Sequence, residues 1–499
     1  CTYVPQAETL SFDEGTDISE APLFRYRNYY TGDISEYPAF AARLRMYSEQ
    51  TPDEGTYGYE GDFYQNETYG NTHNIFDYLR ENEYPKSDPA YSDFYVSNFK
   101  QITTFDDVCY SNGVDENGEL EYTFDEQKTV ANIVLHSLIE FAAADPDAKF
   151  FMIGINDAAD SFCSCELCSA RTEQYGGFRS ANHILFMNLM ARELKKVYPE
   201  RDINIVFFAY YWTEQPPVKE ENGQYVALDD KLVLEDNLYV RYAPINANLA
   251  YAVGDSAHNG SSYSTLNRWR ALTDNFFLWD YQEYFDNYAW YMPTLGTLAD
   301  GIAWYAEIGV EGLLQLAAYN EPEDWQSKLK SYVASKLYWN ADANVGELVD
   351  EFVTLYYGAD AAPYVVQFID IMESHFAYLR SGGNFSINTL FGGVHYLSYE
   401  TYPAALLQTC IDLLKDAQQA VSGNQKLTEL QKNEYIERLH EVSVTPKIML
   451  FENYDSYYET GKGEAAEALF EAFDAAGITC VGEHISLAQY KAAKGYLND

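Results

Sequence analysis

Short apolar runs alternate with amphipathic helical segments over the first two thirds of the chain, and this alternation constrains the fold most strongly. The runs Phe150–Ile155 and Ile203–Ala209 are continuously apolar, as expected for strands buried on both faces of a parallel sheet. Helical patterns such as Val130–Ala144 and Ala181–Val197 lie between several of these runs. The predicted strands are Leu23–Tyr29, Tyr57–Tyr64, Ile102–Cys109, Lys149–Ile155, Ile203–Tyr210, Leu238–Tyr242, Phe276–Tyr281 and Gly312–Leu316.

Eight strands alternating with helices predict an α/β fold, a (β/α)8 TIM barrel that occupies residues 21–335. A doubly wound open sheet is the alternative, but the sequence contains neither a GxGxxG loop nor a P-loop. After about Ser335 the pattern is helical only, and Asn344 with Glu347 resembles a capping box at one helix start. We therefore expect an all-helical C-terminal domain over residues 336–499 that packs against the barrel.

Residues 1–20 read as a linker or the tail of a preceding domain. Cys1 has two interpretations, either the lipid-bearing first residue of a mature bacterial lipoprotein or the arbitrary start of an excerpt. The excerpt is favoured, and no signal peptide is visible.

The net charge of −45, from 77 acidic and 32 basic residues, argues against nucleic acids and anionic membranes as partners. The sequence has no uncharged apolar stretch of about 18 residues, so no membrane span is expected. The 46 tyrosines give weak support for a glycan ligand, because most aromatic rings pack in the core. Composition therefore argues against nucleic acids and anionic membranes as partners but does not identify a substrate.

Asp157 is the strongest candidate for a catalytic residue. It follows the predicted fourth strand, and the active sites of TIM barrels lie at the carboxyl ends of the strands. A carboxyl group at a buried strand end can have a raised pKa and act as the general acid of a glycosidase. The adjacent Asn156 would orient a substrate acetamido group or a water molecule. Alternatively, the Asn156–Asp157 pair only caps the loop.

A second carboxylate would support the ordinary two-carboxylate mechanism, and Asp280 and Glu283 at the seventh strand are the candidates. Side chains alternate along a strand, so Trp279 and Asp280 cannot both face inward. The pattern alone does not decide whether Asp280 or Glu283 is the second carboxylate. The residues expected to shape a sugar pocket are Arg27, His73, Tyr210, Trp212, Trp279, Tyr281 and Asn320.

Four cysteines form a second group. Cys163, Cys165 and Cys168 give a C-x-C-x-x-C motif after Asp157, and Cys109 ends the neighbouring predicted strand. Four thiolates suit a structural Zn²⁺, whereas disulfides and free thiols are the alternatives. A closed shell of four cysteines leaves no open coordination position, so the metal would pin the loop that positions Asp157. No organic cofactor is expected.

Several of these motifs together resemble a bacterial domain-of-unknown-function family of glycosidase-like TIM barrels. The resemblance covers most of residues 20–380, whereas the segment Tyr84–Tyr95 departs from the family pattern. Its fold relatives are the β-hexosaminidases and α-glucuronidases, which implies acid chemistry at Asp157 beside Asn156. The matching motifs are Tyr26-Arg27, Thr72-His73-Asn74, Cys109, Ile155-Asn156-Asp157, C-x-C-x-x-C, Ser180, Phe186-Met187-Asn188, Tyr198-Pro199, Ala209–Thr213, Pro216-Pro217, Lys336–Asn340 and Tyr356-Tyr357-Gly358.

We therefore expect an extracytoplasmic bacterial glycoside hydrolase that removes terminal sugars of the N-acetylhexosamine or uronic-acid type from an oligosaccharide or glycoconjugate. A two-carboxylate glycosidase that pairs Asp157 with Asp280 or Glu283 is one alternative. A non-catalytic glycan-binding barrel is another, and a purely structural surface protein is a third. The sequence does not fix the oligomeric state.

Overall fold

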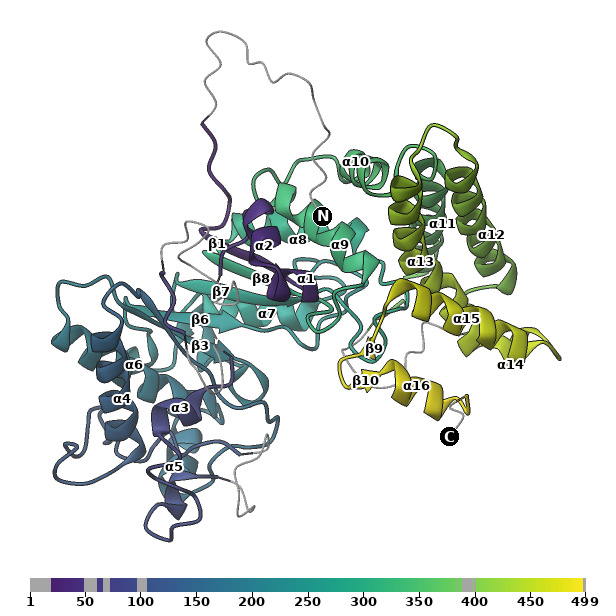
Figure 1. Ribbon diagram of the computed structural model, residues 1–499. Coiled ribbons are helices and arrows are strands. Elements are labelled where there is room, and N and C mark those ends of the chain that lie inside the picture. The colour runs from purple at the N-terminus through teal and green to yellow at the C-terminus, as the bar shows by residue number, and fades with distance from the viewer. Residues whose placement is uncertain are drawn as a thin grey trace.

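The computed structural model describes residues 19–48, 61–65, 72–96, 106–383, 385–387, 398 and 401–496. Its centre is a six-stranded parallel sheet in the order β1-β8-β7-β6-β3-β2 (Figure 1). All six strands lie within predicted strands or extend them by one residue. Their bounds are β1 Tyr26–Tyr30, β2 Phe150–Ile153, β3 Asn204–Ala209, β6 Leu238–Tyr242, β7 Phe276–Tyr281 and β8 Gly312–Leu316.

The sheet is a parallel half-barrel and does not close into the predicted eight-stranded barrel within the described residues. At the predicted second strand, Phe63 forms one parallel bridge with Phe150, and residues 57–60 lie outside the described ranges. At the predicted third strand, Val108 pairs antiparallel with Tyr95, and residues 102–105 lie outside the described ranges. Among the described residues, isolated bridges stand where ladders would join β1 to β2 through these two strands.

Helices follow most of the strands and cover the outer face of the sheet, as parallel strands require. The predicted helix Val130–Ala144 is confirmed with identical bounds, and Thr129 caps it by accepting from the backbone of Asn132. A small antiparallel hairpin, β4 Val218–Glu221 with β5 Gln224–Ala227, follows β3. The helices are α1 Gly32–Glu36, α2 Pro38–Arg43, α3 Ile75–Leu79, α4 Val130–Ala144, α5 Glu166–Gln174, α6 Ser180–Val197, α7 Gly260–Trp269, α8 Leu295–Glu307 and α9 Trp325–Leu337, with short 3-10 turns at Ser92–Phe94, Tyr211–Thr213 and Asp230–Leu232.

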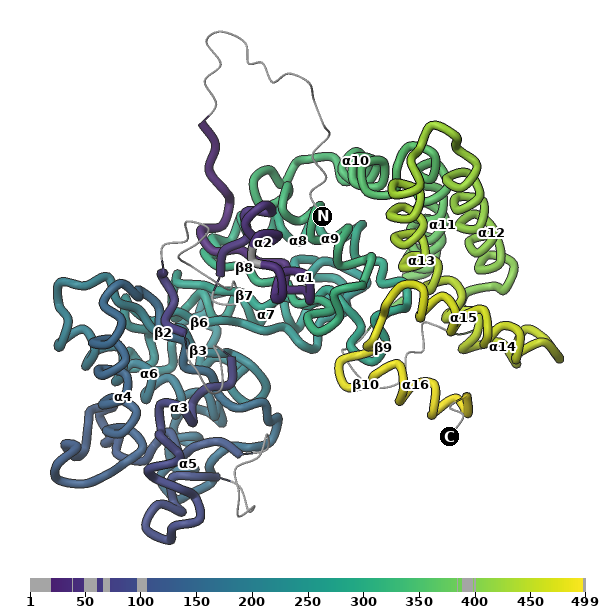
Figure 2. The backbone as a smooth tube through the Cα atoms, in the orientation of Figure 1, coloured from purple at the N-terminus to yellow at the C-terminus, as the bar shows by residue number. Residues whose placement is uncertain are grey.

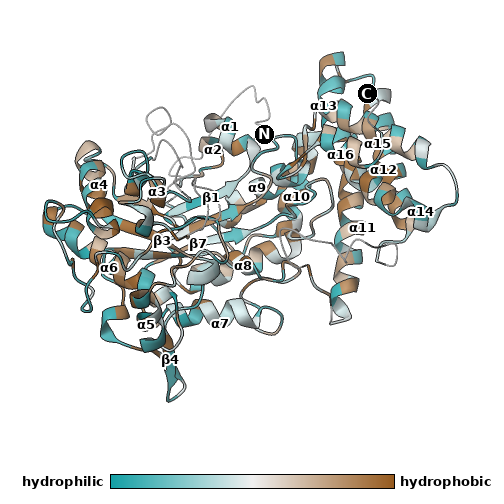
Figure 3. Ribbon diagram, turned by 90° about the horizontal axis from the view of Figure 1, so that it is seen from below, coloured by the Kyte–Doolittle hydropathy of each residue, from teal (hydrophilic) through white to brown (hydrophobic). Residues whose placement is uncertain are grey.

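The C-terminal region is helical, as predicted, but it also contains a short β-hairpin, β9 Cys480–Gly482 with β10 Ile485–Ser486. The chain leaves the sheet through α10, runs through the helices, and returns in this hairpin (Figure 2). In Figure 3 these helices carry hydrophobic residues on part of their surface and hydrophilic residues on the rest. Their bounds are α10 Val345–Tyr357, α11 Ala362–Ser381, α12 Ala404–Gly423, α13 Glu429–Glu452, α14 Tyr454–Tyr457, α15 Lys462–Ala476 and α16 Leu487–Ala493.

A buried ion pair fixes this region to the sheet domain. Lys328 on α9 lies 3.0 Å from Glu441 on α13, and both side chains are buried. Asn344 caps α10, as predicted, by accepting from the backbone N–H of Glu347 at 3.3 Å. No helix within the described ranges is long and apolar enough to cross a membrane.

The inner face of the sheet follows the alternation of side chains along each strand. Towards the amino ends lies an inner cluster separate from the main core. Phe208 and Trp279 lie two residues beyond the members of this cluster on β3 and β7, on the same face of the sheet. The guanidinium of Arg241 lies 5.5 Å from the ring centre of Phe208 and 5.8 Å from that of Trp279. The inner cluster consists of Tyr26, Phe63, Phe150, Met152, Val206 and Phe277.

Candidate active site

A pocket of about 390 Å³ lies at the carboxyl ends of the strands, which is where parallel α/β folds place their ligands. Its volume falls within the ~300–1,000 Å³ typical of small-molecule sites. Five of the residues predicted to form the site line it, namely Asp157, His73, Tyr210, Trp279 and Tyr281. The others that line it are Tyr30, Thr72, Phe208, Tyr211, Ala243, Ile245, Phe285, Leu316, Tyr319, Glu483 and His484.

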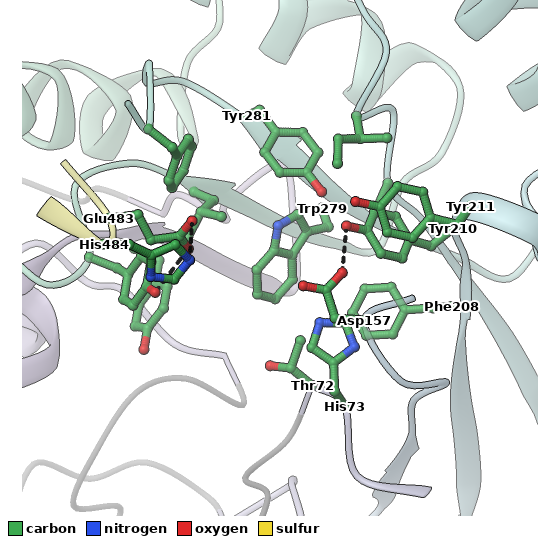
Figure 4. A pocket seen from close by; sticks show the side chains of 16 residues that line it. Thr72, His73, Asp157, Phe208, Tyr210, Tyr211, Trp279, Tyr281, Glu483 and His484 are labelled. Atoms are coloured by element: carbon green, nitrogen blue, oxygen red, sulfur yellow. Dashed lines mark hydrogen bonds and ion pairs between the residues drawn. The ribbon is translucent and has the colours of Figure 1, made fainter. Parts of the chain in front are cut away.

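Asp157 lies four residues beyond β2 and points into the pocket (Figure 4). The Tyr210 hydroxyl donates a hydrogen bond to Asp157 Oδ1 at 3.1 Å. Contrary to the prediction of a buried carboxyl group, the Asp157 side chain is exposed. The carboxyl group therefore meets both a ligand and water without rearrangement.

Gly154, at the end of β2, allows the loop with His73 to approach the strand closely. A Cβ at Gly154 would lie 1.6 Å from the backbone oxygen of Thr72. Asn74 fixes the approach, because its Oδ1 accepts from the Gly154 N–H at 2.8 Å. His73 Nδ1 lies 2.8 Å from the carbonyl oxygen of Ile155. A carbonyl only accepts, so Nδ1 donates this hydrogen bond, and Nε2 is the ring nitrogen left for a ligand.

Replacing Gly154 by Ala is expected to destabilise the protein by about 3 kcal/mol or more, because the new methyl group meets backbone that cannot yield. Urea unfolding would measure the free energy of unfolding. Gly463→Ala on α15 is the matched control, because nothing lies within 4 Å of the position that its Cβ would take, and it should leave stability unchanged or slightly raised. Equal stability of the two variants would contradict the close approach of the loop to β2.

The second carboxyl group in the pocket belongs to Glu483, in the turn between β9 and β10. Glu483 Oε1 accepts from the Tyr319 hydroxyl at 2.9 Å, and its backbone N–H donates to the Phe285 carbonyl at 2.8 Å. Burial raises the pKa of Glu483, and this effect outweighs the hydrogen bond from Tyr319, which lowers it. His484 Nε2 lies 3.6 Å from Glu483 Oε2. Figure 4 shows Glu483 and Asp157 on opposite sides of Trp279.

The loop after β8 anchors the hairpin through a buried carboxylate. Glu321 Oε2 accepts from the backbone N–H groups of Thr479 at 2.8 Å and Cys480 at 2.6 Å. Gly482 packs directly on the loop after β7, because a Cβ there would lie 2.6 Å from the backbone oxygen of Asp286. Side chains and backbone therefore both hold Glu483 at the rim of the pocket.

Asn320 supports this hairpin and does not line the sugar pocket as predicted. Its Nδ2 donates to the backbone oxygen of Glu483 at 3.0 Å. Its Oδ1 accepts from the Tyr288 hydroxyl at 2.8 Å. Both ends of the amide are thus used within the protein.

Asn156 also lies outside the pocket, directly behind Asp157. It is 7% exposed, and its Nδ2 donates to the carbonyl oxygen of Asp106 at 2.8 Å. Its amide therefore fixes the backbone next to Asp157 and does not face a ligand.

Asp280 and Glu283 face the interior on the helix side of the sheet. Asp280 is 4% exposed and accepts from the side-chain amides of Gln282 at 2.8 Å and Gln315 at 2.9 Å. Glu283 is fully buried, and burial raises its pKa to about 8 although the charge of Lys330 opposes the shift. The strand alternation thus brings the aromatic neighbours of Asp280, and not its carboxylate, to the pocket.

Arg27 and Trp212 occupy other parts of the fold. Arg27 is the second residue of β1, at the opposite end from the pocket, and its guanidinium lies 5.5 Å from the ring centre of Trp339. Trp212 packs against Tyr110 and His183, with ring centres 5.8 and 5.7 Å apart. Both side chains support the structure around the sheet and contribute nothing to the pocket lining.

The four predicted cysteines come together at the end of the loop that follows Asp157. Their sulfur atoms lie within 4.8 Å of one another, and Cys109 Sγ is 4.0 Å from Cys165 Sγ and 3.7 Å from Cys168 Sγ. Cys165 also caps α5 by accepting from the Cys168 N–H. None of the four forms a disulfide. In a tetrahedral zinc site with Zn–S bonds of ~2.3 Å the sulfurs are ~3.8 Å apart, so this cluster fits such an ion.

Fold and site together define an α/β protein with a small-molecule pocket at the carboxyl ends of a parallel sheet, and similar solved structures are glycoside hydrolases. One is a family GH115 4-O-methyl-α-glucuronidase with specificity for decorated arabinogalactans (10% identity, TM-score 0.42, 71% of this chain and 45% of that chain covered). Another is a GH138 enzyme targeting pectin rhamnogalacturonan II (11% identity, TM-score 0.35, 94% of this chain and 63% of that chain covered).

The chain belongs to the family described as "Domain of unknown function (DUF4838)", which matches residues 1–370. This confirms the predicted membership of a domain-of-unknown-function family. No curated protein matches the sequence. The chain spans less than two thirds of the length of both glycoside hydrolases, and identities this low do not transfer a substrate or a catalytic residue.

Proposed function

We propose that this protein is a glycoside hydrolase that removes a terminal sugar from a glycan. The observation that carries the proposal is the pair of carboxyl groups, Asp157 and Glu483, on opposite sides of one aromatic-lined pocket (Figure 4). Glycosidases use two carboxyl groups that flank the scissile bond. Trp279 and the tyrosines offer flat faces for a sugar ring and hydroxyl groups for its polar edges.

The surroundings of the two carboxyl groups support different roles. Glu483 is partly buried and has a raised pKa, so it is suited to hold a proton and donate it to the departing oxygen. Asp157 is exposed and accepts from Tyr210, which suits a carboxylate acting as nucleophile or base. This reverses the role that the sequence favoured for Asp157. The position of Asn156 behind the pocket supports two-carboxyl catalysis over a substrate-assisted mechanism.

Turnover of chromogenic aryl glycosides, screened as hexosides, N-acetylhexosaminides and uronides, tests this proposal. Hydrolysis of at least one substrate, lost in Asp157→Asn, supports a hydrolase. A non-catalytic glycan-binding protein would bind sugars without turning over any substrate in the panel. Failure to bind or hydrolyse every sugar would contradict the proposal.

We also propose that the four clustered cysteines hold a structural zinc ion. The cluster ends the loop that begins at Asp157, so the metal would restrict this loop and supply no chemistry to the reaction. Metal analysis of purified protein is expected to give one zinc per chain, and Cys168→Ser should abolish binding and lower the Tm. Cys410→Ser is the control, because Cys410 is a buried cysteine on α12 outside the cluster, and this variant should keep its zinc. Wild-type protein purified without metal would contradict the proposal.

A further inference from the structure

The pocket contains two carboxyl groups and no strong cation. Asp157 and Glu483 both line it, and none of the described residues that line it is a lysine or an arginine. The ranges outside the described residues contain a single residue of these types, Lys100. When Glu483 has released its proton, a ligand that enters the pocket therefore meets a negative field.

Arg241 and His484 are positive or titratable groups near the pocket, and neither offers a binding site for an anion there. Arg241 lies below the pocket floor, is 1% exposed, and does not line the pocket. His484 lines the pocket, but its Nε2 lies 3.6 Å from Glu483 Oε2, so any positive charge on it is paired with that carboxyl group. Neither group is placed to bind a ligand carboxylate.

The hydrogen-bonding groups of the pocket are rich in acceptors. Tyr210 occupies one oxygen of Asp157, and Tyr319 occupies one oxygen of Glu483. The second oxygen of Asp157, Oδ2, remains to accept from a ligand, whereas Oε2 of Glu483 lies 3.6 Å from His484 Nε2. His73 adds Nε2, which accepts from a ligand when the ring is neutral, because Nδ1 donates to a backbone carbonyl. Sugar hydroxyl and N–H groups are donors that match these acceptors.

Given the proposed glycosidase function, we propose that the pocket takes terminal amino sugars, free or N-acetylated, and excludes uronic acids. An amino sugar supplies N–H donors, and the free amine also supplies positive charge. A uronate would bring a third carboxyl group into a pocket whose described lining offers no lysine or arginine to bind it. This charge difference between ligands should be worth at least about tenfold in affinity.

The test compares the Kd of glucosamine, N-acetylglucosamine and glucuronic acid at pH 7.5 and low salt, by tryptophan fluorescence or calorimetry. The galacto series is measured in parallel, because the charge argument does not depend on ring configuration. Both amino sugars are expected to bind at least about tenfold more tightly than the uronic acid. The ratio of the Kd of glucuronic acid to the Kd of glucosamine should shrink at high salt and in the Glu483→Gln variant. The surface control Glu467→Gln should leave this ratio unchanged.

Two outcomes separate this inference from the proposed function. Uronic acids that bind as tightly as amino sugars, together with uronide turnover that Asp157→Asn abolishes, would overturn the selectivity and leave the hydrolase standing. A protein that binds no sugar would overturn both. An unchanged glucosamine-to-uronate ratio in Glu483→Gln would overturn charge as the source of selectivity.

Discussion

Asp157→Asn is expected to lower kcat/KM by about 10³-fold or more, whatever the leaving group of the substrate. The substitution keeps an oxygen that accepts from Tyr210 but removes the negative charge that a nucleophile or base requires. Steady-state rates on a dinitrophenyl glycoside and on an alkyl glycoside would measure the effect. Binding of the sugar should persist, because the shape of the pocket is retained.

The control for Asp157→Asn is Asp160→Asn, which removes an exposed charge from the same loop outside the pocket lining. It should retain nearly full activity. If Asp157→Asn spared the dinitrophenyl substrate and lost only the alkyl substrate, Asp157 would be the general acid, as the sequence favoured.

Glu483→Gln is expected to show the opposite dependence on the leaving group. The amide oxygen can still accept from Tyr319, but the side chain can no longer deliver a proton at the scissile bond. Hydrolysis of an alkyl glycoside should fall by about 10²–10⁴-fold, whereas a dinitrophenyl glycoside, whose leaving group needs little protonation, should lose far less. Glu467→Gln, on the exposed side of α15, is the matched control.

The pH profile gives a second readout for Glu483. Burial raises the pKa of this carboxyl group, and the acid must be protonated to act. Activity should therefore be present below the raised pKa and fall as the pH rises through it. Glu483→Gln should remove this basic limb of the kcat/KM profile, and a basic limb that persists would contradict the assigned role.

The site residues that the sequence predicts correctly lie in the strands or directly after them. Continuous apolar runs identify β2 and β3, so the residues that follow them, Asp157 and Tyr210, fall at the correct end of the sheet. Strand parity also resolves the ambiguity at β7. Phe277 lies in the inner cluster, so Trp279 shares its face and Asp280 does not. The prediction that Arg27 shapes the pocket is wrong, because Arg27 lies at the amino end of β1 and the pocket lies at the carboxyl ends of the strands.

Glu483 could not be predicted in the same way. It lies in a turn far along the chain from Asp157, after a long helical region with no strand pattern. Its place at the pocket depends on tertiary contacts with Phe285 and Tyr319, which no local spacing reveals. Among the described residues, the runs around Phe63 and Val108 form single bridges and not ladders, so the sheet does not close into the predicted barrel there.

The late position of the hairpin that carries Glu483 in the chain has a consequence for the synthesis of the proposed hydrolase. The ribosome completes β1 to β8 and the Asp157 loop long before it makes β9 and β10. A nascent chain with a finished sheet still lacks one of its two proposed catalytic carboxyl groups. If the proposed two-carboxyl mechanism holds, the pocket is complete only after the helices from α10 to α15 have emerged and the hairpin has docked, so the growing polypeptide should be inert towards glycans.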